Sequence, residues 1–219
     1  MNAFVLFTKI PKAGFSKTRL QPDLTPRQSE ALSFCLLADL IKEFSLPKSF
    51  AFWLAYTPKD ELDRIRHILP YGFTNTFSQT EGDLGGRMLH AMEFLFAKGY
   101  KKVALAGSDI PALTRRHVED AFIRLEENDL VLGPTEDGGY YLIASKTSPR
   151  KTLFRLRTWG NETVWDRTRT AGEKLGQTIG SIERLRDVDT VEDLIALPAD
   201  TPAHTLKFVQ SLRLQEKDR

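Results

Sequence analysis

The stretch Ala3-Phe-Val-Leu-Phe-Thr-Lys-Ile-Pro-Lys-Ala-Gly-Phe-Ser-Lys-Thr-Arg-Leu20 contains the two features that decide the fold. Its first part, residues 3–8, is an apolar run rich in β-forming residues, and its second part is a loop with one glycine and four cations. An uninterrupted apolar run is typical of a strand buried on both faces, as in a parallel sheet. Open parallel sheets bind ligands beyond the carboxyl ends of their strands, so we expect this loop at the ligand-binding edge.

Similar apolar runs recur along the chain and alternate with helical patterns. Further strands are expected at residues 50–56, 102–106, 129–133 and 177–182. Apolar residues at helical spacing predict a helix over residues 26–44 and a second helix that ends at Gly99, because glycine commonly follows the last turn of a helix. This βαβ alternation predicts an α/β protein with a mainly parallel sheet.

Three helix starts are expected where a threonine precedes a proline, at Thr25-Pro26, Thr57-Pro58 and Thr201-Pro202. Threonine is a good N-cap residue, and proline is well suited to the first helical position. Gln28 and Asp60 lie three residues after the first two threonines, where they can complete capping boxes. These local signals support the helix assignments in addition to the hydropathy pattern.

The composition excludes several classes of protein. The 219 residues carry a net charge of +2, with 41% hydrophobic and 27% charged residues, as expected of a globular chain that does not wrap nucleic acid. The N-terminus lacks a signal-peptide pattern and no run of 18 apolar residues exists, so we expect a cytoplasmic protein without a transmembrane segment. We predict one domain over residues 1–198 and a C-terminal helical extension over residues 199–219, and the sequence does not indicate the oligomeric state.

The basic loop after the first strand is the first candidate site. The candidate cations of this loop are Lys9, Lys17 and Arg19, and they lie beside a turn at Gly14. Such an arrangement suits the phosphates of a nucleotide. The loop is not a Walker A motif, because Pro11 and Ser16 occupy the places where that motif has glycines. A solvated basic loop is the alternative interpretation.

The second candidate is the segment Gln79-Thr-Glu81-Gly82-Asp83-Leu-Gly85-Gly86-Arg87-Met88, a turn that leads into a helix. Asp83 suits a helix N-cap as well as a ligand, and these two interpretations remain equal. Gly85 and Gly86 cost helix stability, on the order of 1 kcal/mol each relative to alanine, which is explained if a bound ligand approaches the backbone closely.

Acidic residues at strand ends form the third candidate, a site for Mg²⁺ or Mn²⁺. Asp109 directly follows the strand at 102–106, and magnesium in proteins typically takes one or two carboxylates plus substrate phosphates. Asp187 and Asp189 alternate along an extended segment, so both should point to one side, and we expect one of them to join Asp109. Asp109 could instead cap the turn before Pro111.

A turn with two glycines lies between these acids, at Glu136-Asp137-Gly138-Gly139. The glycines would allow the backbone to approach a ligand, and an aromatic strand follows. A plain hairpin turn explains Asp137-Gly138 almost as well.

Common hydrolase and metal-cage motifs are missing from the sequence. It has no G-x-S-x-G, no H-E-x-x-H and only one cysteine, and its four histidines are scattered.

Five segments, taken in order, resemble the motif set of a known family. They are Lys9-x-Pro11-x-x-Gly14-x-x-Lys17-Thr18-Arg19-Leu20, Gly82-Asp83-Leu84-Gly85-x-Arg87-Met88, Gly107-Ser108-Asp109-x-Pro111, Gly133-Pro134-x-x-Asp137-Gly138-Gly139-Tyr140-Tyr141 and Asp187-Val188-Asp189-Thr190-x-x-Asp193-Leu194. The chain resembles bacterial proteins labelled GT-A-type glycosyltransferases, in the nucleotide-diphospho-sugar transferase superfamily. The same framework is similar to 2-phospho-L-lactate guanylyltransferases and, more distantly, to molybdenum-cofactor nucleotidyltransferases.

The resemblance implies a three-layer α/β/α Rossmann-like GT-A fold, with Asp109 in the place of the metal-binding aspartate. Ser108 departs from the Asp-x-Asp pattern of typical glycosyltransferases, so the second metal ligand must come from elsewhere. The leading hypothesis is a metal-dependent transferase that uses a nucleotide-sugar and a small-molecule acceptor. Nucleotidyl transfer from a triphosphate to a phosphorylated acceptor is the alternative, and a catalytically silent nucleotide-binding protein is the second alternative.

The hypothesis assigns each candidate residue a role. Phosphates are expected on the basic loop and the metal on the acids. Asp109, Asp137 and Lys17 are expected to take part in catalysis, and an acceptor hydroxyl or the catalytic base is assigned to Asp83, Glu136 or Asp137. Further substrate contacts are expected at Gly85, Arg87, Gly138 and Gly139.

Overall fold

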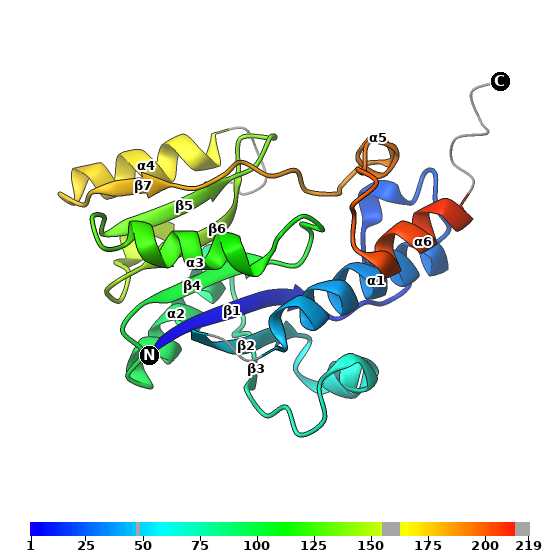
Figure 1. Cartoon of the computed structure of the whole chain (residues 1–219), viewed down its shortest axis with the longest axis horizontal. Coiled ribbons are helices and arrows are strands. Elements are labelled where there is room, and N and C mark those ends of the chain that lie inside the picture. The colour runs from blue at the N-terminus through cyan, green and yellow to red at the C-terminus, as the bar shows by residue number, and fades with distance from the viewer. Residues whose placement is uncertain (47–48, 155–162, 213–219) are drawn as a thin grey trace.

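The computed structural model describes residues 1–46, 49–154 and 163–212. Within them the chain forms one twisted seven-stranded sheet flanked by helices (Figure 1). The strands are β1 (Asn2–Lys9), β2 (Phe50–Thr57), β3 (Thr76–Ser78), β4 (Val103–Gly107), β5 (Leu130–Pro134), β6 (Tyr140–Ser145) and β7 (Ile179–Ser181). The α-helices are α1 (Pro26–Phe44), α2 (Leu84–Ala97), α3 (Arg115–Arg124), α4 (Val164–Lys174), α5 (Val191–Ile195) and α6 (Ala203–Ser211). Short 3₁₀ segments are η1 (Thr18–Leu20), η2 (Lys59–Ile68) and η3 (Lys151–Phe154).

The sheet is mainly parallel, as predicted. Its strand order is β3-β2-β1-β4-β6-β5-β7, and β6 alone runs antiparallel to its neighbours among the described strands. The carboxyl ends of β1, β2, β3 and β4 therefore share one edge, and the amino end of β6 lies at that same edge. This arrangement brings the loops after β1 and β4 and the turn before β6 together.

Two hydrophobic clusters on opposite faces of the sheet make this a three-layer fold. Phe4 and Leu6 of β1 point to the face covered by α1 and α3, whereas Val5 and Phe7 point to the face covered by α2 and α4. This alternation is the period of two that a pleated strand requires. All four of these side chains are at most 9% exposed, as expected of a strand buried on both faces.

The predicted capping signals have different outcomes. Helix α1 begins at Pro26 with a complete capping box, in which the Thr25 side chain accepts from the Gln28 backbone N–H, as predicted. The prediction at Thr57 and Asp60 is wrong: Thr57 is the last residue of β2, and Pro58 precedes a 3₁₀ segment without a side-chain cap. A threonine–proline pair at the end of a strand satisfies the same local pattern, which explains the error.

The predicted cap at Thr201 is also wrong, because α6 begins one residue later and Pro202 occupies its N-cap position. Asp39, from the middle of α1, takes over the capping role. Its carboxylate accepts from the backbone N–H groups of His204 and Thr205 at 3.2 and 2.8 Å, and from the Thr205 hydroxyl at 2.8 Å. Helix α6 is thereby attached to α1.

A third hydrophobic cluster connects α6 to the ligand-binding edge. Leu20 of η1 and Val188 are fully buried in it, together with residues of α1 and α5. Phe208 and Val209 of α6 pack against the same cluster. Leu20 directly follows Arg19, and Val188 lies between Asp187 and Asp189, so one small core supports both loops that carry these charges.

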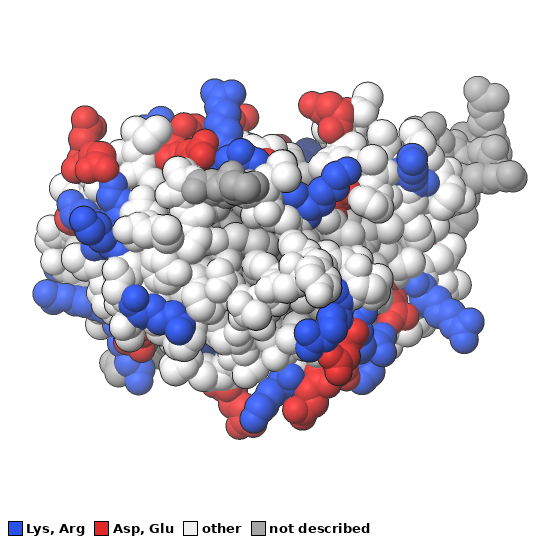
Figure 2. Space-filling view, turned by 60° about the horizontal axis from the view of Figure 1, so that its bottom comes forward, with Lys and Arg blue, Asp and Glu red and all other residues white. Residues whose placement is uncertain are grey.

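Charge is mixed on the molecular surface. On the face shown in Figure 2, lysines and arginines are interspersed with acids around the margin, and the centre is largely uncharged. None of the described helices combines the length and the apolar character needed to span a membrane.

Candidate functional site

Two adjoining cavities open at the carboxyl edge of the sheet. The larger cavity has a volume of about 600 Å³ and lies over β1, β2 and β4, and the smaller one, of about 310 Å³, lies between β4 and the β5–β6 turn. Phe7, Leu84, Gly107, Asp109 and Asp189 line both cavities. We call the place where Asp109 and Asp189 separate the two cavities the junction.

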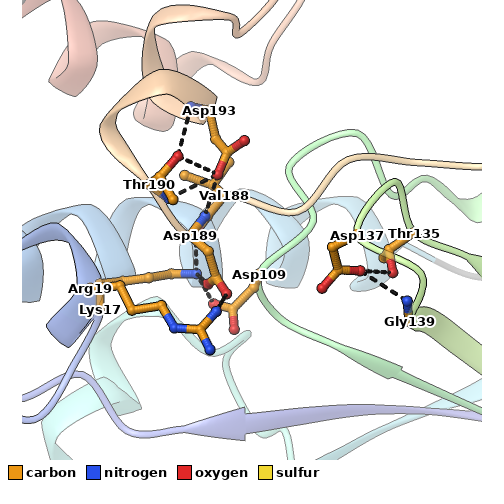
Figure 3. A network of polar contacts seen from close by, with 10 residues as sticks. All are labelled: Lys17, Arg19, Asp109, Thr135, Asp137, Gly139, Val188, Asp189, Thr190 and Asp193. Carbon is orange, nitrogen blue, oxygen red and sulfur yellow. Dashed lines mark hydrogen bonds and ion pairs between the residues drawn. The ribbon is translucent and has the colours of Figure 1, made fainter. Parts of the chain in front are cut away.

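Lys17 is the central cation of the junction (Figure 3). Its ammonium lies 2.7 Å from Asp109 Oδ1 and 3.3 Å from Asp189 Oδ1, and it also donates to the backbone carbonyl of Val188. The Lys17 side chain is only 5% exposed. Burial acts to lower the pKa of Lys17, but the charges and hydrogen bonds of Asp109 and Asp189 outweigh it and raise that pKa above its ordinary value. The ammonium is therefore held in its charged form.

The backbone at Lys17 is strained. Its φ and ψ of 47° and 49° lie in the left-handed region, where a residue other than glycine costs on the order of 1–3 kcal/mol. This conformation directly precedes η1, whose Leu20 anchors the loop in the core.

The acidic side of the junction is fixed by backbone contacts. The Val188 N–H donates to the Asp109 carbonyl at 3.1 Å, which ties the two acidic segments together. Thr190 and Asp193 form the predicted capping box of α5, and Asp193 also accepts from the Asp189 N–H at 3.0 Å. Asp189 is therefore held in place by the start of α5.

Arg19 is part of the same network. Its guanidinium donates to Asp189 Oδ2 at 3.1 Å, and its side chain is 66% exposed. Of the three cations expected to bind phosphates, Lys17 and Arg19 are thus ion-paired with acids. A phosphate that binds here would meet a locally balanced set of charges, to which a divalent cation can be added.

Asp187 carries negative charge without a cation partner among the described residues. Its half-buried carboxyl lines the smaller cavity but does not take part in the Lys17 ion pairs. Burial, followed by the nearby charges of Asp137 and Asp189, raises the pKa of Asp187 to about 6. Asp187 and Asp189, which we expected to point to one side, both line the smaller cavity, but only Asp189 pairs with Lys17.

Asp137 and Gly139 lie across the smaller cavity from Asp109, as Figure 3 shows. Asp137 Oδ1 accepts from the Thr135 hydroxyl and from the Gly139 N–H at 3.0 Å, and these bonds fix the turn. Glu136 instead pairs with Arg186 at the surface. Gly138 has a φ of 85°, so the turn itself explains this glycine.

The residues of the second candidate segment have different roles: some form the N-cap of α2, and others line the cavities. Asp83 is the N-cap of α2 and accepts from the Gly86 N–H at 2.7 Å, and a Cβ on Gly86 would lie 3.1 Å from Asp83 Oδ1. The cap therefore explains why Gly86 is small. Asp83 and Gly85 are not among the described residues that line either cavity, whereas Arg87 lines the larger one.

The remaining residues of the basic loop lie near the rim. Lys9 lines the larger cavity, and its ammonium donates to the Phe15 carbonyl at 2.9 Å. Gly14 has a φ of 80° in the turn between them and is not one of the described lining residues.

The acids fit a metal that arrives with a phosphate ligand better than a metal held by protein alone. No group of three or more His, Cys, Asp or Glu side chains within the described residues is arranged to hold a metal ion. Magnesium commonly uses only one or two carboxylates, with phosphates and waters completing the shell. Asp109 is 57% exposed and Asp187 has no cation partner in the described structure, so both are suited to such a shared ion.

A family model described as "Uncharacterized protein conserved in bacteria (DUF2064)" matches residues 41–161, more than half of the chain. The chain belongs to this DUF2064 family. The matched region runs from the end of α1 through β6 and includes Asp109 and Asp137.

Two relatives match nearly the whole chain. A 2-phospho-L-lactate guanylyltransferase of Methanothermobacter thermautotrophicus is 25% identical over 215 residues, which are 95% of this chain and 91% of the relative. A structure from Desulfovibrio desulfuricans, provisionally described as a nucleotide-diphospho-sugar transferase, is 28% identical and superposes with a TM-score of 0.86 over 98% of both chains. The predicted resemblance to this superfamily is thus confirmed.

A more distant structure shares the fold alone. The 4-diphosphocytidyl-2C-methyl-D-erythritol synthase of Anaerococcus prevotii has a TM-score of 0.57 and 12% identity, covering 89% of this chain and 93% of that one. The DUF2064 chain therefore has the Rossmann-like fold of nucleotidyltransferases and nucleotide-diphospho-sugar transferases.

The sequence assigned no role to several residues that line the larger cavity, notably Thr8, Gln79 and Ser108. Thr8 and Ser108 hydrogen-bond to each other at 3.0 Å between the ends of β1 and β4. All three are neutral side chains at strand ends, where position is the only signal. Gln79 begins the second candidate segment, but the sequence indicated no role for it, because the short β3 that positions it was not predicted.

Proposed function

We propose that this protein is a transferase that binds a nucleotide-sugar donor with a divalent cation and transfers the sugar to a small-molecule acceptor. The observation that supports this most strongly is the junction, where acids and a buried lysine separate two cavities of different character. One cavity would hold the nucleotide and the other the group that reacts with it.

The larger cavity suits the nucleotide part of the donor. Lys17 and Arg19 would contact the phosphates, with Lys9 at the rim. Because Lys17 is buried, its charge is less screened by water than that of a surface lysine. It would stabilise the negative charge that develops on the diphosphate as the bond to the sugar breaks.

The metal, Mg²⁺ or Mn²⁺, would be held by Asp109 together with Asp187 or Asp189. Once bound, the ion would neutralise charge on the leaving phosphates. In the free protein Lys17 pairs with Asp109 and Asp189, and the bound ion would share these carboxylates with it.

The smaller cavity favours a hydroxyl-bearing group over a phosphorylated one. Its described lining includes four carboxylates, Asp109, Asp137, Asp187 and Asp189, beside aromatic Tyr140 and Tyr141. Carboxylates accept hydrogen bonds from sugar hydroxyls but repel phosphates. Asp137 uses Oδ1 to hold its own turn, so its second oxygen would accept the proton of the attacking hydroxyl.

Nucleotidyl transfer is the second candidate, and the guanylyltransferase relative supports it. In that reaction the acceptor would attack the α-phosphate and pyrophosphate would leave, whereas in glycosyl transfer the bond from the sugar to the diphosphate breaks and a nucleoside diphosphate leaves. The junction would serve either reaction, because both develop negative charge on phosphate oxygens.

The products distinguish these reactions. The protein with Mg²⁺ or Mn²⁺ is first screened by thermal shift against nucleoside triphosphates and nucleotide-sugars, and each ligand that stabilises it is then incubated with sugar acceptors. We expect stabilisation by a nucleotide-sugar and release of a nucleoside diphosphate. Stabilisation by a triphosphate alone, with release of pyrophosphate, would establish nucleotidyl transfer instead. Tight metal-independent binding with no product would indicate a silent nucleotide-binding protein.

A further inference from the structure

Arg87 differs from Lys17 and Arg19 in the larger cavity, because it has no acidic partner among the described residues. Lys9 also lacks an acidic partner in the described part of the chain, but its ammonium donates to the Phe15 carbonyl. Its Nη1 donates to Gln79 Oε1 at 3.1 Å, and its Nε is buried without a hydrogen-bond partner. A guanidinium carries five N–H donors and stays charged at all physiological pH values. A buried donor without a partner costs about 1–3 kcal/mol, so this side chain is suited to a ligand that supplies acceptors.

Gln79 fixes the position of Arg87. Its amide nitrogen donates to the backbone carbonyls of Thr8 and Ala55 at 2.9 and 3.0 Å, which uses both amide hydrogens. The orientation of the amide is therefore determined, and Oε1 must face Arg87. The Gln79 backbone N–H also donates to the Tyr56 carbonyl at 2.8 Å, so the residue is anchored to the ends of β1 and β2.

The larger cavity thus has two chemically different ends. At the junction, Lys17 and Arg19 are paired with Asp109 and Asp189, and this end suits phosphates with a metal. The end at Arg87 lies over β1 and β2, one to two strand spacings or about 5–10 Å away from the end of β4. A nucleotide held by its phosphates at the junction would extend its base toward Arg87.

We propose that Arg87, positioned by Gln79, reads the base of the bound nucleotide and selects guanine. The guanidinium presents donors in a fixed fork, and guanine presents two adjacent acceptors, O6 and N7. On the edge where guanine carries O6 and N7, uracil offers O4 alone, whereas adenine and cytosine place an amino donor at the corresponding position. This inference rests on the proposed nucleotide site but holds for either transfer reaction, since both a guanosine diphosphate sugar and GTP carry this base.

The base preference of the full-length protein tests the role of Arg87. Calorimetric titrations with Mg²⁺ compare GDP, IDP, 7-deaza-GDP, UDP, ADP and CDP. GDP and IDP should bind alike, because inosine keeps O6 and N7, and both should bind at least tenfold more tightly than ADP and CDP. Replacing N7 by carbon in 7-deaza-GDP should weaken binding about fivefold, because one hydrogen bond is lost. Equal binding of all bases would overturn the inference and leave the proposed function standing, whereas no binding of any nucleotide would overturn both.

The variant Arg87→Lys separates base recognition from phosphate binding. Lysine keeps the charge but loses the fork, so the GDP-to-ADP ratio should fall to within about twofold, with the effect of Mg²⁺ on binding unchanged. A uniform loss for all nucleotides, with the ratio preserved, would place Arg87 on the phosphates and contradict the inference.

The variant Gln79→Glu tests the positioning role with little change in side-chain volume. A carboxylate cannot donate to the Thr8 and Ala55 carbonyls, so the new side chain would lose its fixed position. Its charge would also pair with Arg87 and occupy donors of the guanidinium that are proposed to face the base. We expect the same collapse of base preference as in Arg87→Lys, in protein shown to be folded by circular dichroism. An unchanged preference in folded Gln79→Glu would remove Gln79 from this role. If Gln79→Glu does not fold, Arg87→Lys and the 7-deaza ligand still decide the inference.

Discussion

At the scale of single residues, Lys17 explains why acids and cations that are far apart in the sequence lie together. Its ammonium joins Asp109 and Asp189, which belong to different loops, and its backbone adopts a strained conformation to do so. A metal ion bound between Asp109 and Asp189 would neutralise the same two carboxylates that the Lys17 ammonium neutralises. A bound Mg²⁺ ion should therefore compensate in part for the loss of the Lys17 ammonium.

The variant Lys17→Met tests this compensation. Removing the ammonium leaves Asp109 and Asp189 without it, and because Asp109 is more than half exposed we expect a loss of about 1–2 kcal/mol rather than the larger loss at a fully buried pair. Millimolar Mg²⁺ without nucleotide should restore part of the melting temperature in the variant and affect the wild type less. The control is Lys12→Met, whose lysine pairs with Glu61 away from the junction. An equal effect of Mg²⁺ on all three proteins would contradict the compensation.

Gly107 provides a second residue-scale prediction. It lines both cavities at the end of β4, and a Cβ added there would meet no atom within 4 Å. We expect Gly107→Ala to leave the free energy of unfolding unchanged or to raise it by less than about 1 kcal/mol. If a nucleotide approaches this strand end, calorimetry should show weaker binding, by at least fivefold. Unchanged binding would place the ligand elsewhere.

At the scale of secondary-structure elements, Asp39 is the link between α1 and α6. Its side chain is 4% exposed and contacts His204 as well as Thr205. Burial acts to raise the pKa of Asp39, but the hydrogen bonds from Thr205 and His204 together outweigh it and lower that pKa below its ordinary value. Asp39 therefore stabilises the fold in its ionised form.

The variant Asp39→Asn should lower the free energy of unfolding at pH 7 by about 1–2 kcal/mol, because charge-assisted hydrogen bonds are lost. A lowered folded-state pKa means that the unfolded chain takes up its proton first as the pH falls. The contribution is thus complete above the unfolded pKa of 3.8 and is lost as the pH falls through the folded value. Urea unfolding at pH 7 and pH 3 should show the difference from wild type shrinking at the lower pH. Asp63→Asn, at an 85% exposed site, is the control and should change stability by less than about 0.5 kcal/mol.

The packing of β5 against β6 gives a second element-scale prediction. A Cβ on Gly133 would lie 2.5 Å from the ring of Tyr141, whose hydroxyl donates to the Glu183 carbonyl at 3.0 Å. Gly133→Ala should cost about 1–3 kcal/mol in urea unfolding, because the core cannot accept the added volume. Adding Tyr141→Leu should make room for the methyl group, so the double variant should lose less than the sum of the single losses. Strict additivity would show that the ring is not the obstacle.

At the scale of the whole molecule, local signals predicted the elements and long-range contacts determined the site. The start of α1 follows from its capping box, and the parallel sheet follows from its apolar strands, so both could be predicted. The same kind of threonine–proline signal failed at Thr57, where a strand end produces it too. The pairing of Lys17 with Asp189, 172 residues away along the chain, and the anchoring of Arg87 by Gln79 depend on which strand ends adjoin, and no local pattern contains that information.

The central claim is that the junction between the two cavities binds nucleotide phosphates through a metal held by Asp109. The most direct measurement is the dissociation constant of a stabilising nucleotide, by calorimetry with Mg²⁺ and with EDTA, for the wild type and Asp109→Asn. Asp166→Asn, an exposed carboxylate on α4, serves as the control. We predict at least tenfold tighter binding with Mg²⁺ for the wild type and the control, and no effect of Mg²⁺ for Asp109→Asn. The same dependence on Mg²⁺ in all three proteins would contradict the account.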